Sequence, residues 1–173
     1  MATAGYGEQR VPVDLARIRS RTADIRSALE VLRNYAARPD HGFLGNPEAI
    51  RSARYAIIVL VEAAVSICNH LCSRVVRKAP SSYGDCFLLL ADSGILSGEL
   101  ALRLARMAGF RNLLVHGYAK VDDRRLLHTM RHDLGDVEEY LAHIEVFLKG
   151  GQRNGSGEPA RSDNGGVADT HSE

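Results

Sequence analysis

The segment Gly109–Asp122, GFRNLLVHGYAKVD, is the part of the chain that the other predicted helices serve to hold in place. It contains the pattern Arg-Asn-(x)3-His-x-Tyr, whose polar positions are Arg111, Asn112, His116 and Tyr118. An arginine carries a permanent positive charge and a planar fork of donors that suits phosphate. A histidine exchanges protons near neutral pH. The pattern therefore indicates phosphate chemistry. The alternative is a helix end whose long polar side chains merely extend outward from a core.

The spacing of these residues constrains the site if the segment is helical. At about 100° per residue, Arg111 and Tyr118 lie about 20° apart on one face. Asn112 and His116 stack one turn apart. Arg111 and His116, however, lie about 140° apart around the axis. They converge only if the helix ends or bends near Gly117, if the long arginine reaches around, or if a second subunit completes the site. A glycine favours a helix end, and thus the first route.

Apolar residues that recur every three or four positions predict an all-α fold. The first such helix follows Pro12 and ends before Pro39 and Gly42. Its stripe consists of Leu15, Ile18, Thr22, Ile25, Leu29, Leu32 and Ala36. A second helix is expected from Asn46, a suitable N-cap with a proline directly after it, to about Arg77.

Three more helical segments are expected after a break at the Pro-Ser-Ser sequence. A short helix follows this break and passes through Cys86 to Leu90, and a longer one from Ser97 carries the polar pattern. A single final helix begins at Asp122 or Asp123. Its stripe consists of Leu127, Met130, Leu134, Val137, Leu141, Ile144 and Leu148. No useful strand-like alternation occurs, so we predict an up-and-down bundle of four longer helices and one short helix.

Length and composition indicate one domain at residues 12–149, with a flexible segment at 1–11 and a disordered, glycine-rich tail at 150–173. The longest apolar run, Tyr55–Val65, is broken by Glu62 and is far shorter than the roughly 20 residues that a bilayer requires. The first ten residues do not resemble a signal peptide. We therefore expect a cytoplasmic protein without a membrane partner. Because the net charge is only +1, any RNA must bind through a local basic cleft.

The chain also contains residue types that bind metal ions. Cys68 and Cys72 are one helical turn apart, but no second pair follows at the spacing of a zinc site. We interpret these two residues and Cys86 as buried, reduced thiols. His128 and His132 are four residues apart and have no evident third ligand. We therefore predict neither a metal nor a cofactor.

Three stretches carry a resemblance to a known family: VEAAVSICNHLCSR, PSSYGDCFLLLADSGILSGELALRLARMAGFRNLLVHGYAKVD and LLHTMRHDLGDVEEYLAHIEVFL. Together they resemble the HepT-like toxins of the HEPN superfamily. In that family a Glu, small apolar residues and an Asn-His pair recur in the second helix. The resemblance covers residues 12–149, the full length of such a domain. Its most specific part is GFRNLLVHG together with Tyr118.

The resemblance implies a metal-independent endoribonuclease that acts as the toxin of a toxin–antitoxin pair. His116 would serve as general base or acid toward the RNA 2′-OH or the leaving oxygen. Arg111 would hold the scissile phosphate, and Asn112 would orient either group. Tyr118 would contact RNA and accept AMP from a minimal nucleotidyltransferase (MNT) antitoxin. The added anion would then compete with RNA for the arginine.

Some alternatives remain open. HEPN domains also include non-catalytic subunits that dock on a nucleotidyltransferase or bind a nucleotide, although the intact Arg-His pair favours the enzyme. The family resemblance places Asn69 and His70 at the same cleft as Arg111, as supporting or RNA-binding residues. His70 is otherwise a structural histidine or a favourable charge at a helix end. A homodimer is expected, because the family's dimers place two motifs at one cleft.

Overall fold

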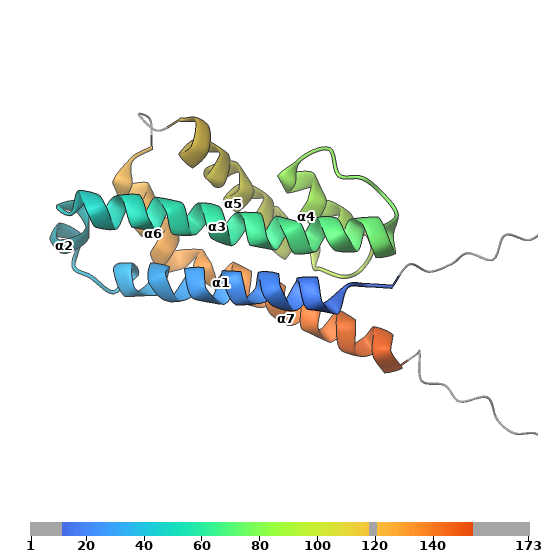
Figure 1. Cartoon of the computed structure of the whole chain (residues 1–173). Coiled ribbons are helices and arrows are strands. Elements are labelled where there is room, and N and C mark those ends of the chain that lie inside the picture. The colour runs from blue at the N-terminus through green and yellow to red at the C-terminus, as the bar shows by residue number, and fades with distance from the viewer. Residues whose placement is uncertain (1–11, 118–120, 154–173) are drawn as a thin grey trace, which may run out of the picture.

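Helices account for all the regular structure in the residues that the structure describes. The computed structural model describes residues 12–117 and 121–153. Within them lie α1 (Leu15–Ala36), α2 (Asp40–Leu44), α3 (Pro47–Leu71), α4 (Tyr83–Asp92), α5 (Gly98–His116), α6 (Asp123–His132) and α7 (Leu134–Arg153) (Figure 1). No strand occurs in these residues, which confirms the all-α prediction. The predicted flexible segment 1–11 and residues 154–173 of the predicted tail lie outside the described residues. Helix α7 continues beyond the predicted domain end at 149.

The antiparallel helices α1 and α3 lie side by side along one side of the molecule (Figure 1). Each begins at a side-chain cap, Asp14 for α1 and Asn46 for α3. The predicted start of the second helix is therefore confirmed. Helix α3 continues into a wider π-helical turn, Cys72–Val76, which ends at Arg77 with a φ of 57°. The predicted end near Arg77 is confirmed as well.

The segment after Asp122 differs from the prediction of one final helix, because it forms α6 and α7 with a break at Asp133. Aspartate and glycine are poor helix formers, and Asp133 and Gly135 flank the start of α7. Tertiary contacts also separate the two helices. Arg131 in the last turn of α6 donates to the carbonyl oxygens of Ala36 and Arg38 at the corner after α1, whereas α7 packs on α5.

The expected turn at Pro39 and Gly42 contains the short helix α2. Its Phe43 side chain is completely buried, with its ring centroid 6.0 Å from that of Tyr35. Burial of this ring explains why the chain forms a helical turn where the sequence indicates only a loop. The predicted longer helices correspond to α1, α3, α5 and α7. The short helices are α2, α4 and α6, instead of one alone.

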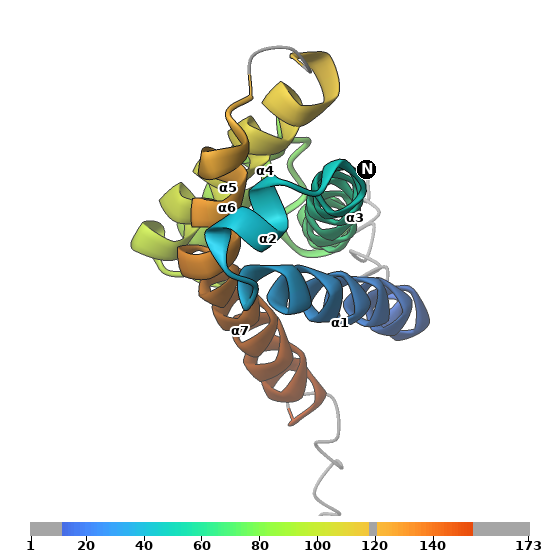
Figure 2. The ribbon, with the colours of Figure 1, turned by 90° about the vertical axis from the view of Figure 1, so that its left-hand side faces the viewer.

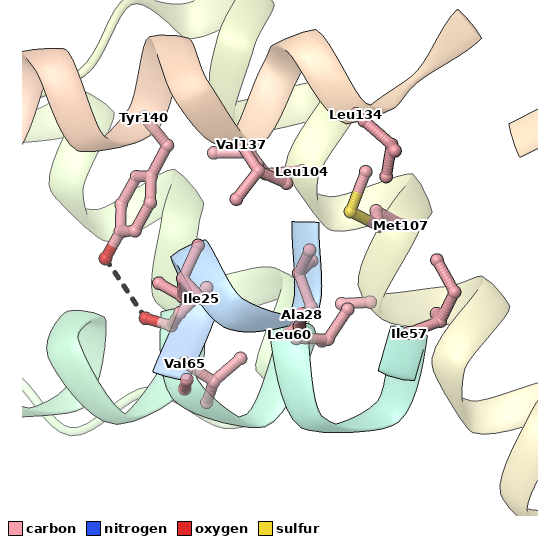
Figure 3. Packing of buried hydrophobic residues seen from close by; sticks show 14 of the residues in the cluster. Ile25, Ala28, Ile57, Leu60, Val65, Leu104, Met107, Leu134, Val137 and Tyr140 are labelled. Atoms are coloured by element: carbon pink, nitrogen blue, oxygen red, sulfur yellow. Dashed lines mark hydrogen bonds between the residues drawn. The ribbon is translucent and has the colours of Figure 1, made fainter. Parts of the chain in front are cut away.

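The hydrophobic core forms where α1, α3, α5 and α7 meet (Figure 3). Val137 of α7 and Leu104 of α5 lie beside Leu60 of α3. The buried Tyr140 hydroxyl donates to the Ala64 carbonyl oxygen at 3.0 Å, which satisfies its polar group. In the view of Figure 2, α1 and α3 lie beside the layer formed by α4, α5 and α6, and α7 extends past α1.

Helix α3 and the π-helical turn that follows it are apolar enough, over residues 47–76, to cross a membrane by length and composition alone. However, 67% of the most apolar 18-residue window is buried inside the bundle. A helix that is apolar on most sides is also what the centre of a helical bundle requires. The packing of α3 is that of a core helix.

Candidate functional site

Arg111 lies on the side of α5 that faces α3, and only 15% of its side chain is exposed. One terminal nitrogen forms an ion pair with the Glu62 carboxylate, and the guanidinium carbon lies 5.2 Å from the centroid of the Tyr83 ring. The other terminal nitrogen donates to Oδ1 of Asn112 at 3.0 Å. The Arg111 Nε is buried without a hydrogen-bond partner among the described residues. The guanidinium is therefore held in place, while part of its donor fork stays unsatisfied.

Glu62 and Tyr83 form the support for this arginine. The Tyr83 hydroxyl lies 3.2 Å from Oε1 and 3.1 Å from Oε2 of Glu62, to which it donates. Burial, followed by the hydrogen bond to Glu62 and the charge of its carboxylate, raises the pKa of Tyr83. The hydroxyl therefore stays protonated and able to donate at neutral pH. In the sequence, Glu62 stands out because its carboxylate interrupts an apolar run. Nothing in the sequence distinguishes Tyr83 as a residue of the site.

His116 is the last residue of α5 and is exposed. The helix ends at Gly117, whose N–H donates to the Leu113 carbonyl oxygen at 2.8 Å. A Cβ at Gly117 would lie 3.0 Å from that oxygen, so glycine suits this tight end. The predicted helix end is present, but both Arg111 and His116 precede it. The end of α5 therefore does not bring the two side chains together: Arg111 faces α3, and His116 points away from the core.

The structure gives fewer contacts for the other residues of the polar pattern. Asn112 is exposed beside Arg111 and accepts its hydrogen bond. Tyr118 lies outside the described residues. His116 belongs to an exposed row along α5 at spacings of three and four residues. The other members of this row are Leu102, Arg106, Gly109 and Leu113. Leu102 and Leu113 are apolar side chains that are 56% and 44% exposed.

Asn69 and His70 occupy different surroundings near the end of α3. The buried His70 accepts the backbone N–H of Asp14 at Nε2, at 2.8 Å, across the junction with α1. Burial, aided by the charges of Arg17 and Arg74, lowers the pKa of His70. These contacts are those of a structural histidine. Asn69 is exposed and lies seven residues after Glu62, so these two side chains share one side of α3.

A pocket of about 240 Å³ between α5 and α6 gathers further positive charge. Arg103, Arg106, Arg125 and His128 line it, together with Phe110, Asp133 and Asp136. The Arg103 guanidinium is neutralised by ion pairs with Asp136 and Glu139. Phe110 precedes Arg111 on α5, so this basic surface adjoins the segment that carries the polar pattern. His128 and His132 have ring centroids 4.4 Å apart, and no described residue completes a three-ligand metal group with them.

Comparison with known proteins finds similarity in sequence over most of the helical region. Residues 25–144 match the family described as Ribonuclease HepT-like. The chain is 32% identical over 85 residues to the mRNA nuclease HepT of Shewanella oneidensis, and 30% identical over 90 residues to the tRNA nuclease HepT of Aphanizomenon flos-aquae. These matches cover 49% and 52% of this chain. They cover 64% and 61% of the two nucleases, which is less than two thirds of their length.

Solved structures share the arrangement of the helices. The tri-AMPylated HEPN toxin of Shewanella oneidensis, in complex with its MNT antitoxin, has a TM-score of 0.71 at 25% identity, covering 75% of this chain and 97% of that chain. A toxin–antitoxin structure with AMP-PNP has a TM-score of 0.72 at 24% identity, covering 76% and 98%. These similarities confirm the HEPN-like fold that the sequence predicts.

Proposed function

The chain belongs to the HepT-like ribonuclease family, and from this premise we propose that it is a metal-independent endoribonuclease, the toxin of a toxin–antitoxin pair. One observation carries the proposal. Within the residues that match the family, Arg111 is fixed between Glu62 and Tyr83, five positions before the exposed His116. A held guanidinium and an accessible imidazole are the groups needed to cleave RNA at its own 2′-OH. With RNA as substrate, we place the reaction in the cytoplasm.

In this mechanism Arg111 binds the scissile phosphate and stabilises the charge that builds on its oxygens. His116 takes the proton of the 2′-OH or gives one to the leaving 5′-oxygen. Asn112 orients either group from the surface of α5. Glu62 and Tyr83 hold the guanidinium before substrate arrives, so less conformational freedom is lost on binding. No step requires a serine or cysteine nucleophile, because the substrate supplies the attacking oxygen.

We further propose that a homodimer completes the site. On one helix Arg111 and His116 point about 140° apart, so a second copy must supply one of the two groups to each scissile phosphate. The exposed row on α5 offers a surface for this contact. It includes His116 and two exposed leucines, Leu102 and Leu113. Gly109 in the same row has no neighbouring atom within 4 Å of where a Cβ would lie, which leaves room for a helix to approach closely.

We propose that a cognate MNT-type nucleotidyltransferase silences the enzyme by adding AMP to Tyr118. This proposal is supported by one of the solved structures with a similar fold, a tri-AMPylated HEPN toxin in complex with an MNT antitoxin. Tyr118 follows His116 by two residues, so an added phosphate would bring a bulky anion next to the proposed catalytic groups. Such an anion competes with the RNA backbone for Arg111.

The test combines RNA cleavage in EDTA with intact mass, on protein produced with and without the candidate antitoxin. The lone protein is expected to cleave, and the co-expressed protein to be inactive and heavier by one or more AMP units. His116→Ala should lower cleavage by at least about a hundredfold, whereas His41→Ala, at an exposed position of α2, should retain it. If co-expression abolishes cleavage without any change in mass, the protein is still a nuclease, but its inhibition does not involve modification of Tyr118. An inert, folded, unmodified wild-type dimer would favour the alternative, a non-catalytic HEPN subunit that docks on a nucleotidyltransferase or binds nucleotide.

A further inference from the structure

Three thiols converge where α3, the π-helical turn and α4 meet. Cys68, Cys72 and Cys86 are free cysteines with no exposed surface, which confirms their predicted burial. Their three sulfur atoms all lie within 4.8 Å of one another. The Cys86 thiol also donates to Oδ1 of Asn69 at 3.3 Å. Residue spacing does not predict this cluster, because Cys86 lies on α4 and meets the other two cysteines only after the chain reverses direction before that helix.

The backbone at this point departs from a regular helix in a way that shapes the cluster. Cys72 is the first residue of the π-helical turn, and its carbonyl oxygen accepts the N–H of Lys78 at 3.3 Å. Its thiol lies 3.7 Å from the Cys86 carbonyl oxygen, toward α4. Turns of this type are rare and frequently occur at functional sites. The irregular turn and the convergence of three thiols are independent observations at one place.

We propose that the three thiols and the Asn69 side chain bind one Zn²⁺ ion as a closed, structural, tetrahedral site. In such a site, with zinc–sulfur bonds of about 2.3 Å, neighbouring sulfur atoms lie roughly 3.8 Å apart. Sulfur atoms within 4.8 Å of one another reach that spacing through small side-chain rotations. The 3.3 Å between Cys86 Sγ and Asn69 Oδ1 is already close to a ligand–ligand distance. Asn69 is exposed and so marks the side from which an ion enters.

The chemistry of the donors favours a thiophilic cation. Thiolates select soft or borderline metals such as zinc over magnesium or calcium. Burial raises the pKa of the Cys68 thiol, whereas a hydrogen bond from Cys68 lowers the pKa of Cys72 to about 7. Full coordination by one Zn²⁺ releases three protons and leaves a net charge of −1, because Asn69 binds as a neutral ligand. The site does not involve Arg111 or His116, so its test needs no nuclease activity.

The experiment is a titration of the reduced full-length protein with Zn²⁺ against a chromophoric chelator, and with Co²⁺ as a spectroscopic probe. One equivalent per chain is expected. Co²⁺ should give the visible bands of a tetrahedral site and sulfur-to-metal charge transfer. Zn²⁺ at a hundredfold excess over its Kd should raise the Tm by roughly 5–10 °C. Cys68→Ser, Cys72→Ser and Cys86→Ser should each abolish the stoichiometric site, because the thiols act together. His128→Ala should leave it intact, since that variant removes only the surface histidine pair.

Several results would overturn the site. These are the absence of tight binding, an octahedral Co²⁺ spectrum, or loss of binding in His128→Ala. The site would also be overturned if about three metal ions bound per chain and each serine variant bound one fewer. That result would mean that the three thiols bind metal independently. Circular dichroism shows whether each serine variant keeps its helical content. If one fails to fold, the Co²⁺ spectrum of the wild-type protein still decides between a tetrahedral thiolate site and none.

Discussion

At Arg111 a carboxylate from α3 and an aromatic ring from α4 meet the same guanidinium, so residues of two other helices set its position. An exposed ion pair contributes little, since solvent screens it and the side chains lose entropy. The Arg111 side chain is only 15% exposed, however, and the Tyr83 hydroxyl donates to the partner carboxylate. The pair therefore fixes where the cation lies more than it adds stability. Under the proposed function, an entering phosphate would meet a guanidinium whose orientation Glu62 and Tyr83 have already set.

Glu62→Gln tests this positioning role. The glutamine keeps the size of the side chain and a hydrogen-bond acceptor for Tyr83 but removes the charge that holds the guanidinium. We expect kcat for RNA cleavage to fall about tenfold, with a smaller change in KM, because the arginine is less well positioned in the transition state. The matched control is Glu138→Gln, which breaks the exposed pair with Arg33 far from the site and should leave both constants unchanged. Equal activity of the two variants would remove Glu62 from the site.

His70 makes stability depend on pH. Its folded-state pKa lies below the ordinary value of 6.5, and its neutral Nε2 accepts the Asp14 N–H. The unfolded chain therefore binds the proton more readily, so stability is complete above about pH 6.5 and declines as the pH falls toward the lower folded-state pKa. Urea unfolding at several pH values should show a flatter profile in His70→Gln, which keeps an acceptor but does not titrate. The exposed control His41→Gln should keep the wild-type slope. Parallel profiles for all three proteins would contradict this account.

At the scale of single residues, a local pattern indicates which side chains are candidates for a site, but not which distant residues contact them. Arg111 and His116 were recognisable because they stand on one segment with an unusual set of polar neighbours. Tyr83 was not, because it reaches Glu62 only after α4 folds back onto α3. The same limit hid the third thiol, Cys86. Contacts between residues far apart in sequence depend on helix packing, which residue spacing does not encode.

At the scale of helices, the corner between α1, α2 and α6 depends on one side chain. The Arg131 guanidinium donates to the carbonyl oxygens of Ala36 and Arg38 and pairs with Asp40 at 2.8 Å. It thereby satisfies two carbonyl groups at the end of α1, where a helix leaves them unpaired. Arg131→Ala should lower the free energy of unfolding by about 1 kcal/mol, after allowance for solvent screening. The measurement is urea unfolding, with Arg21→Ala as the control, because Arg21 forms an exposed ion pair with Asp24 within α1. An effect no larger than that of the control would mean that water replaces these bonds.

The helices themselves were predictable to the extent that each has one continuous apolar stripe. Helix α3 begins at the expected cap, Asn46, and α5 begins directly after Ser97, where the sequence predicts its start. The break at Asp133 was not expected, since the apolar spacing continues across it. Helices α6 and α7 share this spacing but turn toward different neighbours. A stripe therefore predicts which side of a helix is buried, and not against which helix.

For the whole molecule, the directions of two side chains on α5 are the reason for proposing a site shared by two copies. The Arg111 side chain forms an ion pair with Glu62 on the side of α5 that faces α3, whereas His116 is exposed at the end of the helix. Rotation of α5 as a rigid helix does not direct both toward one phosphate, because the two residues leave the helix axis about 140° apart. A second copy that packs on the exposed row of α5 would bring its own His116 near the first copy's arginine. The enzyme would then exist only as a dimer, with two equivalent sites.

A mixing experiment tests the composite site. Arg111→Ala and His116→Ala chains, each inactive alone, are expressed together so that they form dimers at random. If each site takes its arginine from one chain and its histidine from the other, about half of the dimers are mixed and one of their two sites is intact, so activity returns to about a quarter of wild type. Recovery should disappear when Leu113→Glu is added to both chains, because a buried carboxylate opposes association through α5. If the mixed protein is a folded dimer and stays as inactive as its parents, both groups act within one chain. The arginine must then reach around the helix to meet the histidine.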